Sequence, residues 1–217
     1  MSVVGIVPAG GGGGRLGADR PKAFVVLAGR PLLEWSLEAL SPVCDRIVVA
    51  VPPGYERAPG RVAGGRSRSE SVRNALRAAP EARVAVVHDA ARPLVTRELV
   101  ERCLGALEGA DAAIAAAPVT DTVKEAARDG TVLRTLDRSS LWAVQTPQVF
   151  AAASLRRALE VDEEALRAAT DDAMLVERAG GVVRLVEAPP ENLKVTTALD
   201  LTVAEALLRL RVGGPTC

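Results

Sequence analysis

The sequence is poor in aromatic residues, histidine and cysteine. Aromatic residues make up 2% of the 217 residues, and there is one histidine, too few for most histidine-based metal sites. The cysteines, Cys44, Cys103 and Cys217, are odd in number and widely spaced, which argues against a disulfide framework and a zinc site. With so few aromatic side chains, the core must be built from Ala, Val, Leu and Ile.

Net charge and long apolar segments are also absent. Lys plus Arg and Asp plus Glu both number 27, so the formal net charge is zero. A dedicated nucleic-acid binder usually has a basic excess, and we therefore expect no nucleic-acid partner. No apolar stretch reaches the ~18 residues of a membrane helix, and the first residues lack the pattern of a signal peptide. We expect no membrane partner and a cytoplasmic location.

The remaining pattern is an alternation of short apolar runs with helix signals, typical of an α/β domain with a largely parallel sheet. The length suits one domain spanning residues 1–217. Capping-box patterns begin at Ser67 and Thr197. We expect strands over residues 3–8, 46–51, 84–88, 112–116 and 182–186. We expect helices over residues 31–40, 67–79, 96–107, 151–160 and 198–211.

One stretch interrupts this alternation. Residues 120–126 and 131–137 are short extended runs around Asp129-Gly130, a dipeptide that favours a β-hairpin. Neither run is apolar enough for a buried strand, so we expect an arm that projects from the domain over about residues 119–146. Because an isolated hairpin is only marginally stable in water, the arm is expected to pack on a second subunit. The alternative is a surface flap folded back on its own domain.

Five consecutive glycines, Gly10 to Gly14, follow the first expected strand. Glycine lets backbone N–H groups approach a ligand closely, and such loops bind phosphates. Residues 12–17 match the dinucleotide pattern G-x-G-x-x-G only weakly, because no acidic residue follows the second strand. The Gly-Lys-Ser/Thr of a P-loop is missing. Arg15 and Lys22 accompany the glycines instead, and two cations beside such a loop favour a nucleoside triphosphate.

A second candidate site follows the expected strand over residues 84–88. Asp89 comes directly after it, at the edge where open α/β sheets bind ligands. Mg²⁺ often takes one carboxylate together with substrate phosphates. Asp89 is therefore the candidate metal ligand, the alternative being a turn or N-cap aspartate. Arg92 either orders this turn or contacts an acceptor phosphate, and His88 is interpreted as structural.

A series of short motifs runs along nearly the whole chain. The glycine loop with Arg20-Pro21-Lys22 is similar to the signature loop of sugar-phosphate nucleotidyltransferases. More specific motifs lie at residues 64–65 followed by Arg68 and Ser71-Val72, and at residues 88–93 (HDAARP), 118–124, 136–138, 146–148 (TPQ), 170–172 (TDD) and 192–196 (NLKVT). Together these motifs resemble the family of 2-C-methyl-D-erythritol 4-phosphate cytidylyltransferases. Arg66 departs from the family pattern, in which an acidic residue can occur at this position.

The resemblance implies a doubly wound, mostly parallel sheet with an extended arm that forms a homodimer. It implies transfer of CMP from CTP to 2-C-methyl-D-erythritol 4-phosphate, with release of pyrophosphate, in the non-mevalonate route to isoprenoid precursors. The attacking phosphate is already an anion near neutral pH, so no strong general base is required. Catalysis is expected to come from positioning and fixed cations, with Mg²⁺ as the cofactor.

The resemblance also implies roles for individual residues. The catalytic cations would be Arg15, Lys22, Arg138 and Lys194. Thr122 and Arg138 on the arm would reach the partner's site and hold the acceptor, together with Arg92 and Lys194. Nucleotide binding would involve Pro8, Ala9, Gly10, Gly11, Gly12, Gly65, Ser71, Asp89 and Ala90, four of which (Ala9, Gly10, Gly65 and Ser71) would surround the base.

Other functions fit parts of the sequence. A ribitol 5-phosphate cytidylyltransferase would have the same loop and differ in its acceptor pocket. A nucleotide-sensing module without catalysis would need the loop but not Arg138 and Lys194. A dinucleotide-dependent oxidoreductase is disfavoured by the missing acidic residue after the second strand.

Overall fold

A seven-stranded sheet forms the centre of the molecule. The structure, a computed structural model, describes residues 2–12, 16 and 20–212. The strand order is β11-β7-β10-β6-β1-β4-β5. Neighbouring strands are parallel except β10, which is antiparallel to both β6 and β7. The strands are β1 (Val3–Pro8), β4 (Arg46–Val51), β5 (Arg61–Ala63), β6 (Val84–Val87), β7 (Ala112–Pro118), β10 (Trp142–Ala151) and β11 (Val183–Glu187).

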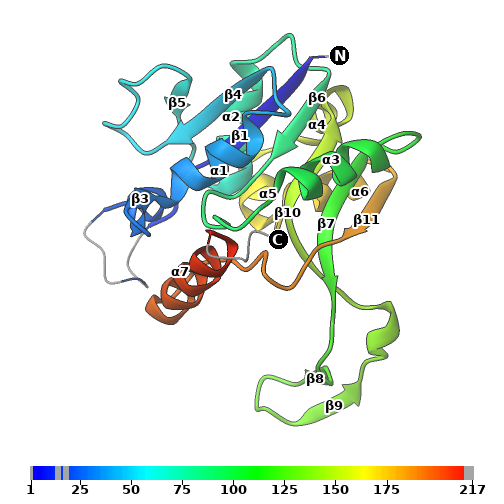
Figure 1. Cartoon of the computed structure of the whole chain (residues 1–217). Helices are drawn as coiled ribbons and strands as arrows, with labels where there is room; N and C mark the ends of the chain where they lie inside the picture. The colour runs from blue at the N-terminus through cyan, green and yellow to red at the C-terminus, as the bar shows by residue number, and fades with distance from the viewer. Residues whose placement is uncertain (1, 13–15, 17–19, 213–217) are drawn as a thin grey trace.

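Helices cover both faces of this sheet (Figure 1). One face packs against α2 (Arg68–Arg77), α4 (Ala152–Ala158), α5 (Glu163–Ala168) and α6 (Asp172–Arg178). The other packs against α1 (Leu32–Leu40) and α3 (Arg97–Ala106). Both interfaces are built almost entirely of aliphatic side chains, as the composition predicts. The predicted doubly wound, mostly parallel sheet is confirmed.

A third, smaller apolar cluster lies beside the sheet. It joins α7 (Ala198–Val212) to the segment between β1 and α1, which contains η2 (Lys22–Phe24), β2 (Val26–Leu27) and β3 (Arg30–Pro31). The capping box predicted at the start of α7 is present, with Asp200 and Thr197 each accepting a backbone N–H of the other. Within the described ranges, none of the helices is long and apolar enough to cross a membrane.

The central strand β10 is the main element that the sequence pattern did not reveal. All five predicted strands are present, with ends that differ by at most two residues. Ala143 and Val144 are exposed, and Pro147 cannot donate to a sheet ladder, which disfavours a central strand. The ladder with β7 accommodates this stretch by a register shift between Val144 and Gln148. The short elements β5, α5 and α6 were likewise not predicted.

The predicted hairpin is present and extends away from the sheet (Figure 1). Its strands are β8 (Lys124–Ala126) and β9 (Val132–Thr135), and Gly130 in the turn has a φ of 86°. Every residue of both strands is exposed, including Val132 and Leu133. Exposed apolar side chains add little stability to a two-stranded ribbon unless another surface covers them. Packing on a second subunit stays a prediction.

Phe150 tests the central position of β10. Its side chain is fully buried between the sheet and the helices of one face. We expect Phe150→Ala to lower the free energy of unfolding by about 3–5 kcal/mol, because a large cavity remains. Val144→Ala, on the same strand but 44% exposed, should cost less than about 0.5 kcal/mol. Urea denaturation measures both values, and equal effects would contradict the buried position of Phe150.

Candidate active site

The candidate site lies where the winding of the sheet reverses. The chain moves from β1 to β4 and β5, then returns across β1 to β6. Such a reversal opens a crevice at the carboxyl ends of β1 and β6, where open α/β sheets bind ligands. The segments that follow these two strands, residues 9–12 and 89–91, line a cavity of about 360 Å³.

The first cavity gathers the residues predicted to bind a nucleotide. Lys22 lines it, and the backbone N–H of Lys22 donates a hydrogen bond to the carbonyl of Gly11 at 3.0 Å, which joins η2 to the glycine-rich segment. Arg15, the other predicted cation of the loop, lies outside the described residues. All nine predicted nucleotide residues are on this cavity: Pro8, Ala9, Gly10, Gly11, Gly12, Gly65, Ser71, Asp89 and Ala90.

Gly65 and the first turn of α2 form another wall of this cavity. A Cβ at Gly65 would lie 2.3 Å from Cγ of Glu70, so no larger residue fits without a shift. The Gly65 N–H donates to Ser71 Oγ at 3.0 Å, and Ser67 caps the helix by accepting from the Glu70 N–H. These contacts hold the Gly65 peptide against the helix, so backbone and small polar groups face the cavity here.

A second cavity, of about 440 Å³, shares Arg68, Asp89 and Lys194 with the first. Arg92 lines the second cavity only. The three shared charged residues therefore lie between the two cavities. The remaining wall comes from β10, α6 and the turn before α6, and it includes Val144, Gln145, Thr146, Gln148, Thr170, Asp171, Met174 and Glu177.

Of the carboxylates in the described part of the chain, Asp89 alone lines both cavities, and it contacts two cations. Arg68 Nε donates to Asp89 Oδ1 at 2.8 Å, and Lys194 Nζ donates to Oδ2 at 2.6 Å. Burial opposes ionisation of Asp89, but the charges of Arg68 and Lys194 outweigh burial and hold the pKa of this carboxyl well below its usual range. Asp89 is thus an anion at any physiological pH.

Arg68 also pairs with Asp172, a residue that the sequence did not single out. Its Nη1 donates to Asp172 Oδ2, and the Asp172 side chain is fully buried at the start of α6. Burial opposes the charge of Arg68, but the two aspartates raise the pKa of Arg68 above its ordinary value. The sequence marked residues 170–172 as one of the family motifs and gave Asp172 no role of its own. Nothing local in the sequence indicates that Asp172 meets a residue 104 positions away.

Arg92 and Asn192 join the turn after β6 to the segment that contains Lys194. Arg92 Nη1 donates to the Asn192 carbonyl at 2.7 Å, and Asn192 Nδ2 donates to Gln145 Oε1 at 2.7 Å and to the Thr146 carbonyl at 2.9 Å. Both Arg92 and Asn192 are buried. Arg92 therefore orders the loop, and its place on the second cavity also leaves it available to an acceptor there.

His88 lies behind the site and lines neither cavity. It is fully buried, and burial lowers its pKa to about 4. Its Nδ1 lies 3.0 Å from Thr146 Oγ1 and its Nε2 lies 3.2 Å from the Arg92 carbonyl. A neutral ring protonated on Nε2 satisfies both contacts, because it donates to the carbonyl and accepts from the hydroxyl. The geometry fits a structural histidine.

The arm residues Thr122 and Arg138 line neither cavity of their own chain. Both are exposed, and Arg138, at the start of η3 (Arg138–Ser140), donates from Nη1 to the carbonyl of Thr120. Within one chain, the structure therefore does not bring these two predicted acceptor ligands to Asp89 and Lys194.

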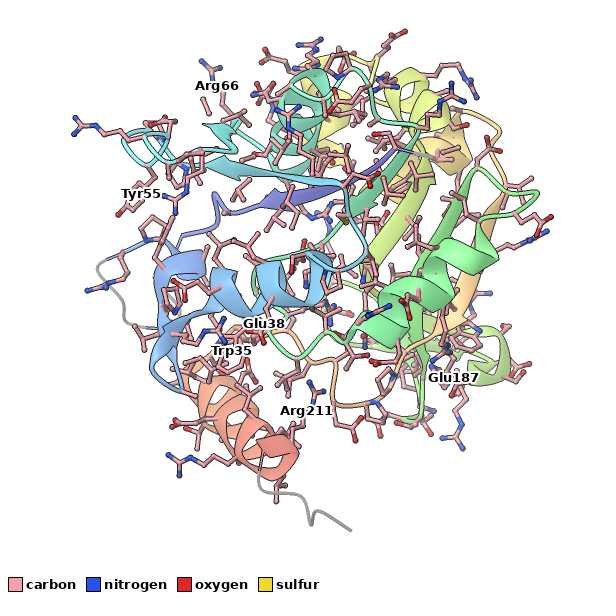
Figure 2. All side chains as sticks on the ribbon, turned by 45° about the horizontal axis from the view of Figure 1, so that its top comes forward. Trp35, Glu38, Tyr55, Arg66, Glu187 and Arg211 are labelled. Carbon is pink, nitrogen blue, oxygen red and sulfur yellow. The ribbon has the colours of Figure 1, made fainter. Side chains whose placement is uncertain are left out.

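The charges on the first cavity define the class of protein. Its described lining holds four cations, Lys22, Arg66, Arg68 and Lys194, and one carboxylate, Asp89. Arg66 is at the periphery with its side chain directed outward (Figure 2), and its N–H donates to Glu70 Oε2 at 2.7 Å. A positive, glycine-lined cavity at a sheet switch point suits polyphosphates. Together with an adjoining polar cavity for an acceptor, it fits the class of nucleotidyltransferases.

Comparison with known proteins narrows this class. The family profile for 2-C-methyl-D-erythritol 4-phosphate cytidylyltransferase matches residues 3–210. A relative of that name from Rubrobacter xylanophilus is 46% identical over 224 residues, which covers 96% of this chain and 95% of the relative. One from Synechococcus elongatus is 41% identical over 228 residues, with 95% and 96% covered.

A solved structure agrees with the sequence comparisons. The crystal structure of 2-C-methyl-D-erythritol 4-phosphate cytidylyltransferase from Thermus thermophilus matches with a TM-score of 0.83 and 39% identity, over 96% of this chain and 100% of that chain. The chain belongs to the 2-C-methyl-D-erythritol 4-phosphate cytidylyltransferase family, as its motifs predicted, and is a cytidylyltransferase.

Gly65→Ala tests the backbone wall of the first cavity. The added Cβ would collide with Glu70 and displace the Gly65 peptide, so we expect CTP affinity to fall by on the order of 10-fold, or about 1.4 kcal/mol. Gly105→Ala is the matched control, because Gly105 lies in α3 and a Cβ there meets nothing within 4 Å. Isothermal titration with CTP measures both. Unchanged affinity for Gly65→Ala would show that this wall does not contact the nucleotide.

Proposed function

We propose that this chain transfers the cytidylyl group of CTP to 2-C-methyl-D-erythritol 4-phosphate, as its family membership indicates. The products are 4-diphosphocytidyl-2-C-methyl-D-erythritol and pyrophosphate, in the non-mevalonate route to isoprenoid precursors. One observation supports the proposal most directly: the two cavities meet at Arg68, Asp89 and Lys194. A nucleotide in one cavity and a phosphorylated acceptor in the other would place their phosphates beside these charges.

CTP would occupy the first cavity. The glycine-rich segment and Lys22 suit the triphosphate, because exposed backbone N–H groups and a cation both favour anions. Gly65 and Ser71, with Ala9 and Gly10, would surround the cytosine. Short polar and backbone groups suit a base edge, since they can place donors and acceptors close to it. Arg15, from the same loop, is assigned to the triphosphate by the family motif.

The acceptor would occupy the second cavity with its phosphate near Arg92 and Lys194. One phosphate oxygen attacks the α-phosphorus of CTP in line, a new P–O bond forms, and the bond to the β-phosphate breaks with its electrons on pyrophosphate. The acceptor oxygen is already anionic near pH 7, because the second pKa of a phosphate monoester is about 6. The site therefore needs no general base, and Lys22 and Lys194 stabilise charge on the transferred phosphate.

Magnesium is proposed as the cofactor, held by Asp89 and the triphosphate. In the described ranges, no group of three His, Cys, Asp or Glu side chains could hold a metal ion by itself. Mg²⁺ is often bound by one or two carboxylates together with substrate phosphates, so a single ionised carboxylate fits an ion that arrives with CTP. When bound, the ion would neutralise phosphate charge. Asp89 would help to hold the ion, and Lys194, which also lines both cavities, would contact a phosphate.

The acceptor is tested by comparing two polyol phosphates. With CTP and Mg²⁺, we expect pyrophosphate release with 2-C-methyl-D-erythritol 4-phosphate, and a kcat/KM for ribitol 5-phosphate lower by on the order of 100-fold. Turnover of ribitol 5-phosphate without turnover of 2-C-methyl-D-erythritol 4-phosphate would show that the proposed acceptor is wrong. Tight CTP binding with turnover of neither compound would indicate a nucleotide-sensing module instead.

We further propose that the arm completes the site of a second subunit in a homodimer. Thr122 and Arg138 are exposed on an arm that extends away from the sheet (Figure 1) and line neither cavity of their own chain, and Val132 and Leu133 leave apolar surface for a partner to cover. A guanidinium suits a bidentate contact to the acceptor phosphate. Each site would then combine the Lys194 of one chain with the Arg138 of the other.

Mixing inactive chains tests this shared site. Lys194→Ala and Arg138→Ala should each lower kcat by on the order of 10²–10³-fold. When mixed and reassorted, their hybrid dimers hold one intact site, so we expect about a quarter of wild-type activity at random two-fold assembly. Lys22→Ala mixed with Lys194→Ala is the control, since both residues belong to the same cavity and no intact site forms. Absence of recovery in proven hybrid dimers would refute a shared site.

A further inference from the structure

Arg68 contacts two carboxylates that come from different elements of the fold. Its Nε contacts Asp89 Oδ1, after β6, and its Nη1 contacts Asp172 Oδ2, at the start of α6. The Asp172 side chain is fully buried, and that of Asp89 is 11% exposed. The guanidinium thus links α2, which forms part of the nucleotide cavity, to α6, which forms part of the acceptor cavity.

Stability alone does not explain a charge at position 172. Bringing a carboxylate and a guanidinium out of water is costly, and apolar residues of similar volume are often as stable. The pairing is also incomplete, because Asp172 Oδ1 and Arg68 Nη2 have no hydrogen-bond partner among the described residues. Val176 and Leu175 show that α6 packs well through aliphatic side chains nearby. The pair therefore fits a role in orientation.

The two oxygens of Asp89 differ in how firmly they are held. Oδ1 accepts from Arg68, whose own position is set by the buried Asp172. Oδ2 accepts from Lys194, whose side chain is 45% exposed and reaches into both cavities. One face of the carboxylate is thus fixed by a planar guanidinium with two anchors. The other is held by a flexible ammonium group.

We propose that Arg68, anchored by Asp172, is a positioning residue that fixes Asp89 through Oδ1 and leaves Oδ2 as the exchangeable side, which Lys194 holds until a divalent cation arrives with the nucleotide. The inference rests on the proposed metal role of Asp89. Lysine cannot replace Arg68 here, because a single ammonium group cannot contact two carboxylates with the fixed geometry of a guanidinium. Asparagine at position 172 keeps the shape but loses the charge that anchors Arg68.

The test is Mn²⁺ binding in the complex with CTP and without acceptor, measured by electron paramagnetic resonance and corrected for Mn²⁺–CTP alone. We expect Asp172→Asn and Arg68→Lys each to weaken Mn²⁺ binding by about 10–100-fold, the range for residues that orient a metal ligand. In the same two variants, the kcat measured with Mg²⁺ should also fall, while the KM for the acceptor changes less. Because Asp172 acts through Arg68, Mn²⁺ binding in the double variant should be no weaker than in the single variant with the larger loss.

Val176→Ala is the matched control for a purely structural role. It weakens α6 through a buried aliphatic side chain four residues beyond Asp172 and leaves the ion pairs intact. The melting temperature should fall in this variant, while Mn²⁺ binding stays at the wild-type value. If Mn²⁺ affinity instead follows the melting temperature across Val176→Ala, Asp172→Asn and Arg68→Lys, Arg68 is a structural residue and the proposal is wrong.

Asp89→Asn separates this inference from the proposed metal site. Loss of Mn²⁺ binding in Asp89→Asn, with wild-type binding in both Asp172→Asn and Arg68→Lys, overturns the positioning role and leaves the metal assignment intact. Retained Mn²⁺ binding in Asp89→Asn overturns both. If Asp172→Asn fails to fold, Arg68→Lys decides the question, because it keeps the positive charge beside both aspartates.

Discussion

The site depends on one buried electrostatic arrangement, the ionised Asp89 between Arg68 and Lys194. Arg68 lies 21 positions before Asp89 in the chain, and Lys194 lies 105 positions after it. The three residues belong to different segments of the chain, and their contacts hold these segments together. Without the two cations, burial would favour the protonated form of Asp89. The anion exists because the fold brings its counter-charges to it, and the two cavities take their common wall from the same three side chains.

The donor side of the site could be predicted because its signals are local. The glycine run, the strand before it and Lys22 lie within one short stretch, and Asp89 follows an apolar strand directly. The segments that follow β1 and β6 then lie at the same edge of the sheet, because the carboxyl ends of parallel strands meet there. Boundaries of the five predicted strands agree with the structure for the same reason: alternating α/β units have strong local patterns.

Long-range and antiparallel features could not be predicted in this way. Pro147 obscures β10 although the strand is central, because its ladder adapts through a register shift that only tertiary pairing reveals. The contact of Arg68 with Asp172 spans 104 positions, and no periodicity marks it. Thr122 and Arg138 were assigned by resemblance, and because they line neither cavity of their own chain, a single chain cannot test their roles. Cytoplasmic location and the absence of a nucleic-acid partner also stay predictions, since no contact bears on them.

The scarcity of histidine agrees with the chemistry that the geometry supports. The one histidine is buried, contacts Thr146 and the Arg92 carbonyl and lines neither cavity, so its place in the fold fits a supporting role for the loop. Attack by a phosphate anion requires no base, and the barrier is set by charge repulsion and alignment. A chain with zero net charge can still meet that demand by gathering cations in one cavity, and among the described residues Lys22, Arg68 and Lys194 line it beside the single carboxylate Asp89. Under the proposed positioning role of Arg68, the rate would also depend on the buried Asp172 that anchors it, although Asp172 lines neither cavity.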